Sequence, residues 1–416
     1  MNLRGMNSHY MRCYNKSVII SHLYRQKVAS KSTLAQLSQL SIPAVSNILD
    51  ELRADGYILR LEQNLHKRGN NSGSYQIATR GNILCLNVSP FLVESVLTDG
   101  LVRPLQPLRQ TPVQITTPQQ LPQEIEKYYR HYRQFEPDTP LRIALSVHGQ
   151  VNPRTGVSER MPQALWHEPI ELRYLLERKL ATRLLMDNDC VMLALAEKWQ
   201  NPDSADDFCV INVDYGIGSS FVIDREIYRG DLFGSGQIGH TIVDPDGTAC
   251  SCGRYGCLET VASLSSLKKQ ARRQLKLTPA SSLENQHINT AWLIERFHAG
   301  DAAVRQMVGN AARAIGLSLY NFLNVLNITH ITLYGRSCLF GEDWLGIIHE
   351  QTYFNPFDHA GTAREGATRI EIGGLTRQRQ IMGIGFLYAE EMMQNEVFNN
   401  TAIHRTTDPA GGKLRL

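Results

Sequence analysis

Residues 236–260, GQIGHTIVDPDGTACSCGRYGCLET, decide how the rest of this sequence is interpreted. Three of the chain's eight cysteines, Cys250, Cys252 and Cys257, lie close together in this stretch, and His240 lies ten positions before the first of them. Three thiolates and one imidazole are a tetrahedral donor set that zinc favours, and the intervening glycines let a short loop wrap around one ion. Because protein fills all four positions, the sequence predicts one structural zinc ion per chain.

Two other uses of these cysteines compete with zinc: a disulfide with a spare thiol, or free cysteines that only pack. A disulfide requires an oxidising compartment. The N-terminus carries no apolar signal-peptide core and no run of about 18 apolar residues follows, so we expect a cytoplasmic protein without membrane insertion. The other five cysteines are scattered singly, as packing residues are. The clustering favours zinc, although His240 has a second interpretation as a satisfied core histidine.

The same stretch carries a family resemblance. The pattern Gly-x-Ile-Gly-His, followed by Cys-x-Cys-Gly-x-x-Gly-Cys-Leu-Glu-Thr, resembles the zinc-binding consensus of the ROK family, which contains repressors, open reading frames and sugar kinases. Val-Asp-Pro before the cysteines and Val-Ala-Ser after them are most similar to the transcriptional-regulator branch. A weaker resemblance covers nearly the whole chain and implies an actin-like sugar-kinase fold.

Charge is distributed unevenly along the 416 residues, although the net charge is only +3. Residues 1–80 contain 11 Lys or Arg against 4 Asp or Glu, a balance of +7, so the remaining 336 residues carry −4. A chain of this length, with 42% hydrophobic residues, can form two or three domains with separate cores. The basic N-terminal part is suited to phosphate contacts, and a solvated charged face is the alternative.

The basic N-terminal part also contains a helix-turn-helix pattern. Apolar residues keep helical spacing from about residue 7 to residue 26, Ser32 is positioned to cap a second helix, and Pro43 suits the first turn of a third. Residues 57–59 are expected to begin a wing. We therefore predict a winged helix-turn-helix DNA-binding domain at residues 1–80, with a helical dimerisation cap as the alternative.

Candidate DNA contacts lie on the third helix and in the wing. Small or hydrogen-bonding side chains gather near the start of the helix, and two basic side chains remain in the wing: Ala44, Ser46, Asn47, Lys67 and Arg68. Asn can read adenine in the major groove. Asp50 and Glu51, further along the helix, oppose phosphates, so only its first turns are expected to approach DNA.

From residue 81 onward, strands and helices alternate twice, which predicts an α/β body of two lobes with a cleft between them. The resemblance identifies these as actin-like lobes of the sugar-kinase, ribonuclease-H-like type. The expected divisions are a first lobe at 81–205, a second lobe with the zinc loop at 206–376, a helix returning to the first lobe at 377–398, and a disordered tail at 399–416. The second lobe is expected to open with strands at 208–213 and 221–225.

Three turns that bind ATP phosphates in kinases of this fold have different residues here. The family places Asp-x-Gly-Gly-Thr at the first turn, where this chain has Asn87-Val88-Ser89-Pro90-Phe91, without the glycines whose amides cradle phosphate. The second turn begins with Asp214, which opposes phosphate, and the third contains Arg336 where kinases keep glycine. The sequence therefore predicts that the body does not bind ATP and that the protein is not an enzyme.

The sugar-binding residues of the family are better matched. Asp187-Asn188-Asp189 is similar to a Glu-Asn-Asp segment in which Asn binds a sugar hydroxyl and Asp is the general base. Without a phosphoryl donor, Asp189 is expected to act only as a hydroxyl acceptor. Glu259 matches a sugar-binding Glu, His240 is expected near sugar as well as metal, and Gln237 replaces the usual Glu. The alternative for Asn188 and Asp189 is a helix N-cap pair.

Together these features predict a sugar-responsive, DNA-binding transcriptional regulator, a repressor of sugar-uptake or phosphotransferase-system genes. The resemblance implies a homodimer or tetramer that binds double-stranded operator DNA. The resemblance also implies that the protein is released from operator DNA either by a sugar inducer or by sequestration on the glucose transporter of the phosphotransferase system. The alternatives are an active sugar kinase with a fused DNA-binding head, and a scaffold whose pocket binds no sugar.

Overall fold

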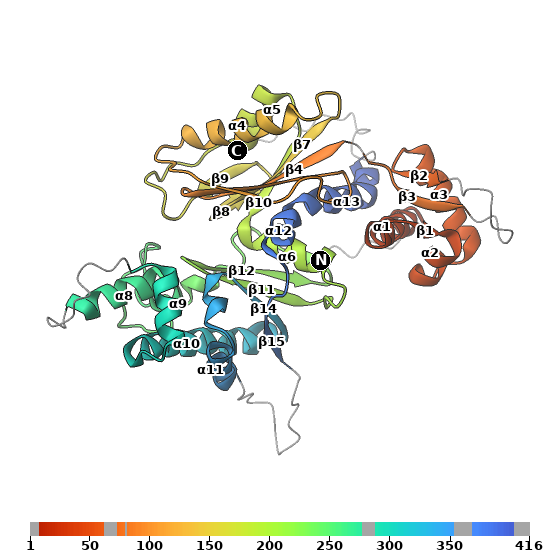
Figure 1. Cartoon of the computed structure of the whole chain (residues 1–416). Helices are drawn as coiled ribbons and strands as arrows, with labels where there is room; N and C mark the ends of the chain where they lie inside the picture. Colours follow the sequence, from red (N-terminus) through yellow and green to blue (C-terminus); the bar gives the residue numbers. More distant parts are fainter. Residues whose placement is uncertain (1–7, 62–72, 80, 277–287, 353–367, 403–416) are drawn as a thin grey trace, which may run out of the picture.

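The computed structural model of this chain describes residues 8–61, 73–79, 81–276, 288–352 and 368–402. Figure 1 shows a small N-terminal head beside two α/β lobes that are stacked on each other, with the C-terminal helix lying between the first lobe and the head. Within the described ranges, no helix is both long enough and apolar enough to cross a membrane.

The head contains three helices and a three-stranded antiparallel sheet. Its elements are α1 (Ser8–Gln26), β1 (Ala29–Ser30), α2 (Lys31–Ser38), α3 (Ile42–Ala54), β2 (Ile58–Leu61) and β3 (Ser74–Ile77), with strand order β1-β3-β2. Pro43 lies in the first turn of α3, as predicted. The predicted cap of α2 was wrong: Ser30 is the N-cap and accepts from the Thr33 N–H. Ser30 has the extended backbone that a cap needs, whereas Ser32 already lies in the helix.

The first lobe has a five-stranded sheet of order β10-β7-β4-β5-β6, in which β4, β7 and β10 are parallel. Its elements are β4 (Asn82–Val88), β5 (Leu92–Thr98), β6 (Arg109–Pro112), α4 (Gln120–Arg133), β7 (Leu141–Val147), the hairpin β8 (Gln150–Asn152) and β9 (Val157–Arg160), α5 (Leu172–Leu180), β10 (Leu184–Asn188) and α6 (Asp189–Gln200). Helices α4 and α5 cover the outer face, and α6 lies on the side of the second lobe (Figure 1).

The second lobe has a five-stranded sheet of order β13-β12-β11-β14-β15. Its elements are β11 (Phe208–Val213), β12 (Ile217–Ile223), β13 (Glu226–Tyr228), the 3-10 turn η1 (Ile238–His240), α7 (Leu258–Ala262), α8 (Leu264–Lys276), α9 (Thr290–His298), α10 (Ala302–Leu326), β14 (His330–Tyr334), the 3-10 turn η2 (Arg336–Phe340), α11 (Glu342–Thr352) and β15 (Arg369–Ile372). The strand predicted at 221–225 in fact begins at Ile217. It stops at Ile223 because Asp224 and Arg225 have positive φ angles and turn the chain into β13.

The two large sheets share one topology. In each, the first strand pairs antiparallel with the second and parallel with the fourth of the lobe. The β4–β5 turn and the β11–β12 turn therefore occupy equivalent positions at the ends of their first strands. The first two of the three segments compared above with kinase phosphate turns lie at these places, and the third follows β14.

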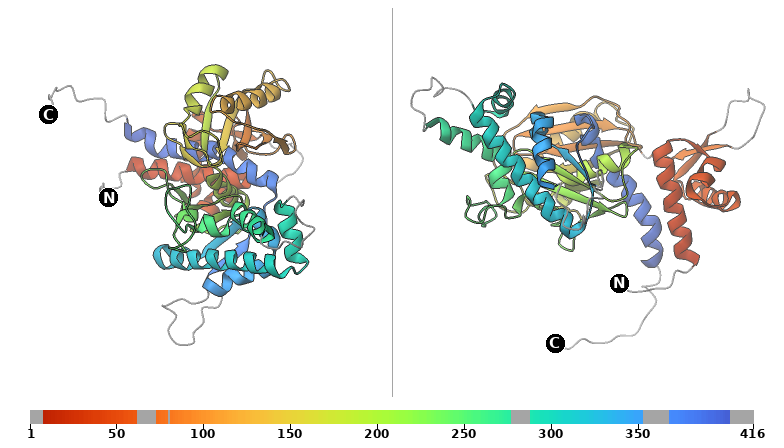
Figure 2. Two further views of the ribbon diagram at one scale, coloured as in Figure 1. Left: turned by 90° about the vertical axis from the view of Figure 1, so that its left-hand side faces the viewer. Right: turned by 90° about the horizontal axis from the view of Figure 1, so that it is seen from below.

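The C-terminal segment returns to the first lobe and the head. It consists of α12 (Arg377–Met382), the 3-10 turn η3 (Gly383–Phe386) and α13 (Leu387–Ala402). Gly383 permits close packing on α6, since a Cβ there would lie 2.2 Å from the carbonyl oxygen of Met192. Figure 2 shows α1 and α13 side by side, and Ser17 Oγ donates to the Met393 carbonyl at 2.9 Å. Residues 399–402, assigned above to a tail, are helical, and 403–416 lie outside the described residues.

Candidate functional site

The four residues predicted to bind zinc converge. One ligand atom from each of His240, Cys250, Cys252 and Cys257 lies within 4.8 Å of the others. Nδ1 of His240 is 3.5 Å from Sγ of Cys250, and the Sγ atoms of Cys252 and Cys257 are 3.6 Å apart. A tetrahedral zinc ion with bonds of about 2.0–2.3 Å sets neighbouring ligand atoms about 3.5–3.8 Å apart. The cluster can therefore hold a metal of this kind, and His240 belongs to it.

Local backbone contacts build this loop. Gly256 has a φ of +65°, and a Cβ there would lie 1.4 Å from the carbonyl oxygen of Asp244, so only glycine fits. The Cys250 N–H donates to the Arg254 carbonyl at 2.7 Å and closes the tight turn that carries Cys252. Burial and the neighbouring thiols raise the pKa of Cys257 to about 12. A cation at the centre of the cluster would favour the thiolate form of Cys257.

Asn188 and Asp189 lie where β10 passes into α6. Asn188 caps the helix, since its Oδ1 accepts from the Val191 N–H at 2.8 Å, as in the N-cap interpretation. Asp189 Oδ2 instead pairs with Nδ1 of His148 at 2.9 Å. Both side chains of this pair are partly open to solvent, with 24% of His148 and 17% of Asp189 exposed.

His148 was missed in the sequence. His148 follows β7, and its backbone N–H donates to the Val88 carbonyl at 3.0 Å, beside the first phosphate turn. Parallel pairing of β7 with β10 sets Val147 opposite Asn188. The residues that follow them, His148 and Asp189, therefore also lie side by side. A single histidine 41 positions from its partner carries no local spacing signal, and only the register of the two strands brings it to Asp189.

Glu259 approaches this pair from the second lobe. Its Oε2 accepts from the Ile217 N–H at 3.0 Å, and a Cβ on Gly216 would lie 2.8 Å from that oxygen. Burial alone lowers the pKa of His148, but the charge and hydrogen bond of Asp189, with Glu259 and Asp214 beyond, raise it overall. Groups from both lobes thus act on the one imidazole of His148.

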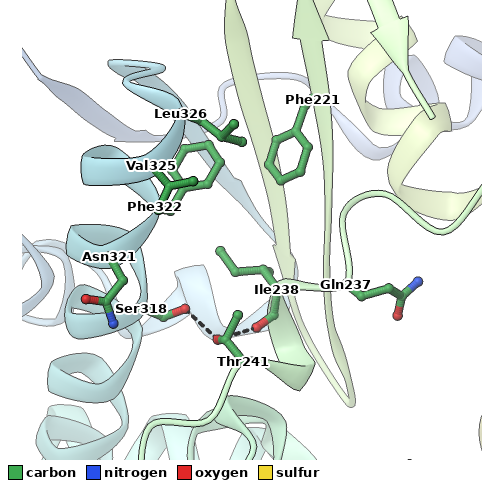
Figure 3. Close-up of a pocket in the computed structure, with 9 residues that line it drawn as sticks. All are labelled: Phe221, Gln237, Ile238, Thr241, Ser318, Asn321, Phe322, Val325 and Leu326. Atoms are coloured by element: carbon green, nitrogen blue, oxygen red, sulfur yellow. Dashed lines mark hydrogen bonds between the residues drawn. The ribbon is translucent and has the colours of Figure 1, made fainter. Parts of the chain in front are cut away.

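Gln237, also predicted to contact sugar, lies on the second lobe between β13 and η1. Its exposed side chain borders a hollow of about 320 Å³ on the second lobe, beside α10. Figure 3 shows its amide pointing away from the stacked rings of Phe221 and Phe322, whose centroids are 5.1 Å apart. Thr241 and Ser318 form the polar side of this hollow, with their hydroxyls 2.8 Å apart. Within the described ranges, Gln237 makes no side-chain hydrogen bond to Asn188 or Asp189.

The first phosphate turn is internally hydrogen bonded. Ser89 Oγ accepts from the N–H groups of Phe91 and Leu92 at 3.4 and 3.1 Å. The Ser89 N–H donates to the Leu92 carbonyl at 3.0 Å, and Pro90 has no N–H to offer. The turn therefore presents few donors to a phosphate.

The second and third phosphate turns are joined by an ion pair. Arg336 donates to Asp214 Oδ1 from Nη2 at 2.6 Å and from Nε at 3.1 Å, and its guanidinium lies 4.2 Å from the ring centroid of Tyr215. The Asp214 carboxylate also accepts from the Tyr215 N–H at 2.7 Å. The sequence argument that the charge of Asp214 opposes phosphate needs correction, because Arg336 neutralises that charge; the ion pair instead links the two turns.

The predicted DNA contacts on α3 differ in exposure. Asn47 is exposed, whereas Ala44 and Ser46 are half-buried and Ser46 Oγ accepts from Lys31 Nζ at 2.7 Å. Glu51 pairs with Arg12 and Lys16 of α1, so its charge is balanced inside the head. The remaining predicted contacts, Lys67 and Arg68, lie outside the described residues.

Residues 101–342 match the family model described as "ROK family". The chain belongs to the ROK family. Protein YphH of Escherichia coli K12, described as uncharacterized, is 54% identical to this ROK chain over 391 residues, covering 94% of this chain and 98% of YphH. The xylose repressor of Caldicellulosiruptor bescii is 22% identical over 407 residues, covering 93% of this chain and 98% of the repressor.

A solved ROK family transcriptional regulator, a homolog of the E. coli Mlc protein, has the same fold as this ROK chain. The TM-score is 0.75 at 20% identity, and the match covers 95% of this chain and 100% of the regulator. The likeness identifies the two α/β lobes as sugar-kinase-like, actin-like lobes. The family contains sugar kinases as well as regulators, glucokinase among them.

Proposed function

We propose that this ROK protein is a sugar-responsive, DNA-binding transcriptional regulator, a repressor of sugar-uptake or phosphotransferase-system genes. The proposal rests on the presence of two parts in one chain. One is a small basic head, and the other is a kinase-like body whose phosphate turns are closed by their own hydrogen bonds and ion pair. Repressors among its ROK relatives support the same assignment.

The head is a winged helix-turn-helix in this proposal. Helices α2 and α3 are separated by residues 39–41, and β2 and β3 form the base of a wing. Asn47 is exposed on α3 and is the residue best placed to reach a base edge. Because α1 neutralises Glu51, the acidic later turns of α3 do not cancel the positive charge that the head offers to phosphates.

The body of the proposed regulator has lost ATP binding. Phosphoryl transfer depends on backbone donors and a metal to cradle the phosphates. Ser89 Oγ accepts hydrogen bonds from the amides of the first phosphate turn, and the Asp214–Arg336 ion pair joins the second and third phosphate turns. We therefore expect no sugar phosphate when purified protein is incubated with magnesium-ATP and glucose, N-acetylglucosamine or mannose. Turnover on the order of 1 per second or more would establish the alternative, an active sugar kinase with a DNA-binding head.

Zinc has a structural role in this proposal. His240, Cys250, Cys252 and Cys257 hold one ion per chain, and the ion fixes a loop that ends two residues before Glu259. The ion closes the loop and supplies no reaction chemistry, because its four positions are filled by protein.

The proposed inducer site lies between the lobes, around Asn188, Asp189 and Glu259. We propose that a sugar bound there changes the relation of the lobes and of the head packed against them. A homodimer or tetramer of the chain acts on double-stranded operator DNA. The glucose transporter of the phosphotransferase system is a second candidate partner, and capture of the regulator by that transporter without any sugar would favour it over a soluble inducer.

A further inference from the structure

The β8–β9 hairpin of the first lobe contacts the second lobe through two arginines. Arg160, at the end of β9, donates from Nη2 to the Ser251 carbonyl at 2.9 Å. Arg154, in the turn between the two strands, places its guanidinium carbon 5.3 Å from the ring centroid of Phe233. The strap, as we name residues 150–160, therefore contacts two separate segments of the second lobe: the loop at 229–236 and the loop that carries the cysteine cluster.

The strap is held to its own lobe by Arg173 of α5. Arg173 donates from Nη2 to the Pro153 carbonyl at 2.7 Å and from Nη1 to the Arg154 carbonyl at 3.0 Å. Gly156, in the same turn, has a φ of +75°, and a Cβ there would lie 2.3 Å from the Cβ of Arg173, so the close approach requires glycine. The strap therefore moves with the first lobe, and only its arginine side chains reach the second.

The loop that carries Phe233 is shaped around its contact with the strap. Phe233 has a φ of +54°, in the left-handed region that bulky side chains rarely adopt. Its N–H donates to the Gly230 carbonyl at 3.3 Å, and the Ser235 N–H donates to the Arg229 carbonyl at 3.1 Å. Backbone strain of this kind persists where the surrounding structure holds it, and it is concentrated at functional segments. Here it places an aromatic ring beside a cation of the other lobe.

The second contact of the strap depends on the cysteine cluster. Ser251 lies between Cys250 and Cys252, in a turn that the Cys250 N–H closes by donating to the Arg254 carbonyl at 2.7 Å. Arg160 binds a backbone carbonyl, so the contact requires the position of this turn and not the side chain of residue 251. A metal held by the flanking cysteines would fix that position.

Buried polar contacts join the lobes at a different place, around α6. Arg229, after β13, donates from Nε to Asp187 Oδ2 of β10 at 2.9 Å, and their side chains are only 24% and 3% exposed. The Tyr334 hydroxyl of β14 donates to Glu197 of α6, and both residues are buried. Breaking such contacts leaves a buried charge without a partner, whereas contacts of exposed arginines are weak and reversible. The contacts of the strap should therefore break first.

We propose that the strap is a releasable fastening between the lobes, and that the lobes open about the buried contacts around α6. Figure 1 shows β8 and β9 on the side of the first lobe that faces away from the head, and α6 nearer to the head. Release of the strap separates the lobes on the side away from the head, while the head keeps its packing on α13. This motion is a hinge opening, in which the Arg229–Asp187 pair stays closed.

Amide hydrogen exchange of the full chain tests the proposal. In the double variant Arg154→Met, Arg160→Met, we expect peptides from residues 229–236 and 248–256 of the second lobe to exchange about tenfold faster or more, because a cation–π contact and a hydrogen bond no longer oppose opening. The Val191 amide, at the start of α6, should exchange as in wild type. Arg178→Met is the matched control, since this exposed arginine lies 5.4 Å from the Tyr174 ring of its own helix, and it should change neither region.

The reciprocal variant distinguishes release of the strap from local loosening. Phe233→Leu in the second lobe should speed exchange of residues 150–160 in the first lobe, and adding Arg154→Met to it should change that exchange by less than about twofold. Unchanged exchange in the double variant, faster exchange confined to the mutated lobe, or an equal gain at Val191 would each overturn the proposal. Loss of bound metal by the double variant, measured by elemental analysis, would assign the faster exchange to the cysteine cluster and would also overturn it.

Discussion

Tyr24 in the head and Trp199 at the end of α6 form an edge-to-face aromatic pair, with ring centroids 5.8 Å apart and planes at 63°. Trp199 also stacks on Phe386 at 5.5 Å, and its indole N–H donates to Glu390 at 2.7 Å. The same helix begins at Asp189, one of the candidate sugar-binding residues. One continuous helix therefore connects the proposed inducer site with the surface on which the head packs.

Replacing Tyr24 with Leu tests this contact. Leu keeps an apolar side chain in the buried position but removes the aromatic pair, which is worth about 0.5–1.5 kcal/mol. We expect urea unfolding followed by tryptophan fluorescence to give a free energy of unfolding lower by that amount, and amide hydrogen exchange in α1 to become faster. Tyr14→Leu, on the same helix but 52% exposed, is the control and should change neither quantity. Equal free energies of unfolding and equal exchange rates in the two variants would mean that the Tyr24–Trp199 contact does not stabilise the packing of the head on the body.

Arg377 in α12 neutralises a carboxylate buried in the first lobe. Glu94 is 1% exposed and accepts from Arg377 Nε, Asn87 Nδ2 and Gln110 Nε2, each at 2.8 Å. Arg377→Met leaves that carboxylate buried without its cation, but the Arg377 side chain is itself 40% exposed and Glu94 keeps two other donors, so we expect a loss of about 1–3 kcal/mol in the free energy of unfolding at pH 7. Arg379→Met, on the same helix at an exposed position, should cost less than about 1 kcal/mol. A similar small cost for both would show that the pairing of Arg377 with Glu94 adds little.

The same pair predicts a pH dependence. Burial raises the pKa of Glu94, but the opposing contributions of Arg377, Asn87 and Gln110 are larger in sum, and the pKa is lowered overall. A carboxylate whose folded pKa is lowered stabilises the fold above its unfolded pKa, about 4.3, and this contribution is lost as the pH falls through the folded value. Without Arg377 the pKa of Glu94 rises, so protonation of Glu94 at low pH removes the unpaired buried charge that destabilises the variant. The difference between wild type and Arg377→Met should therefore shrink below about pH 4, and a constant difference from pH 7 to pH 3.5 would contradict this origin.

Loss of one thiol should remove the proposed zinc. We expect elemental analysis to find about one zinc ion per wild-type chain and none in Cys257→Ser, because three ligands leave an incomplete shell. The loop that leads to Glu259 is then no longer held by the metal, so repression in a reporter assay should be lost although the head is unchanged. Cys338→Ser, outside the cluster, should keep both zinc and repression. A zinc-free Cys257→Ser protein that represses normally would leave the metal without a role, and wild-type protein without zinc would remove the premise.

Sequence reasoning succeeded where the signal was local. The cysteine cluster was predicted because its three thiols lie in one short loop, and the start of α3 because Pro43 marks it. It failed where pairing between distant segments decides the structure. The strand predicted at 221–225 left out residues 217–220, which are strand because they pair with β11. His148 reaches Asp189 only through the register of β7 and β10.

Salt dependence should locate the phosphate contacts of the head. Each lost phosphate contact flattens the slope of log affinity against log salt by about 0.9. The double variant Lys67→Ala, Arg68→Ala should therefore bind operator with a slope about 1.8 units shallower if both residues contact phosphate. Asn47→Ala should keep the wild-type slope and lose sequence preference instead. An unchanged slope in the double variant would exclude these two wing residues from the phosphate interface.

Selection of genomic DNA fragments by the full chain tests the central claim, that the head of this ROK protein binds specific operators, most directly. Wild-type protein and the control Asn324→Ala, which changes an exposed residue of α10 far along the chain from the head, should enrich the same few near-palindromic sites beside sugar-uptake genes. Asn47→Ala should lose that enrichment, and a chain without residues 1–80 should bind none of the sites. No enrichment by wild-type protein, or full enrichment by the chain that lacks residues 1–80, would contradict the account.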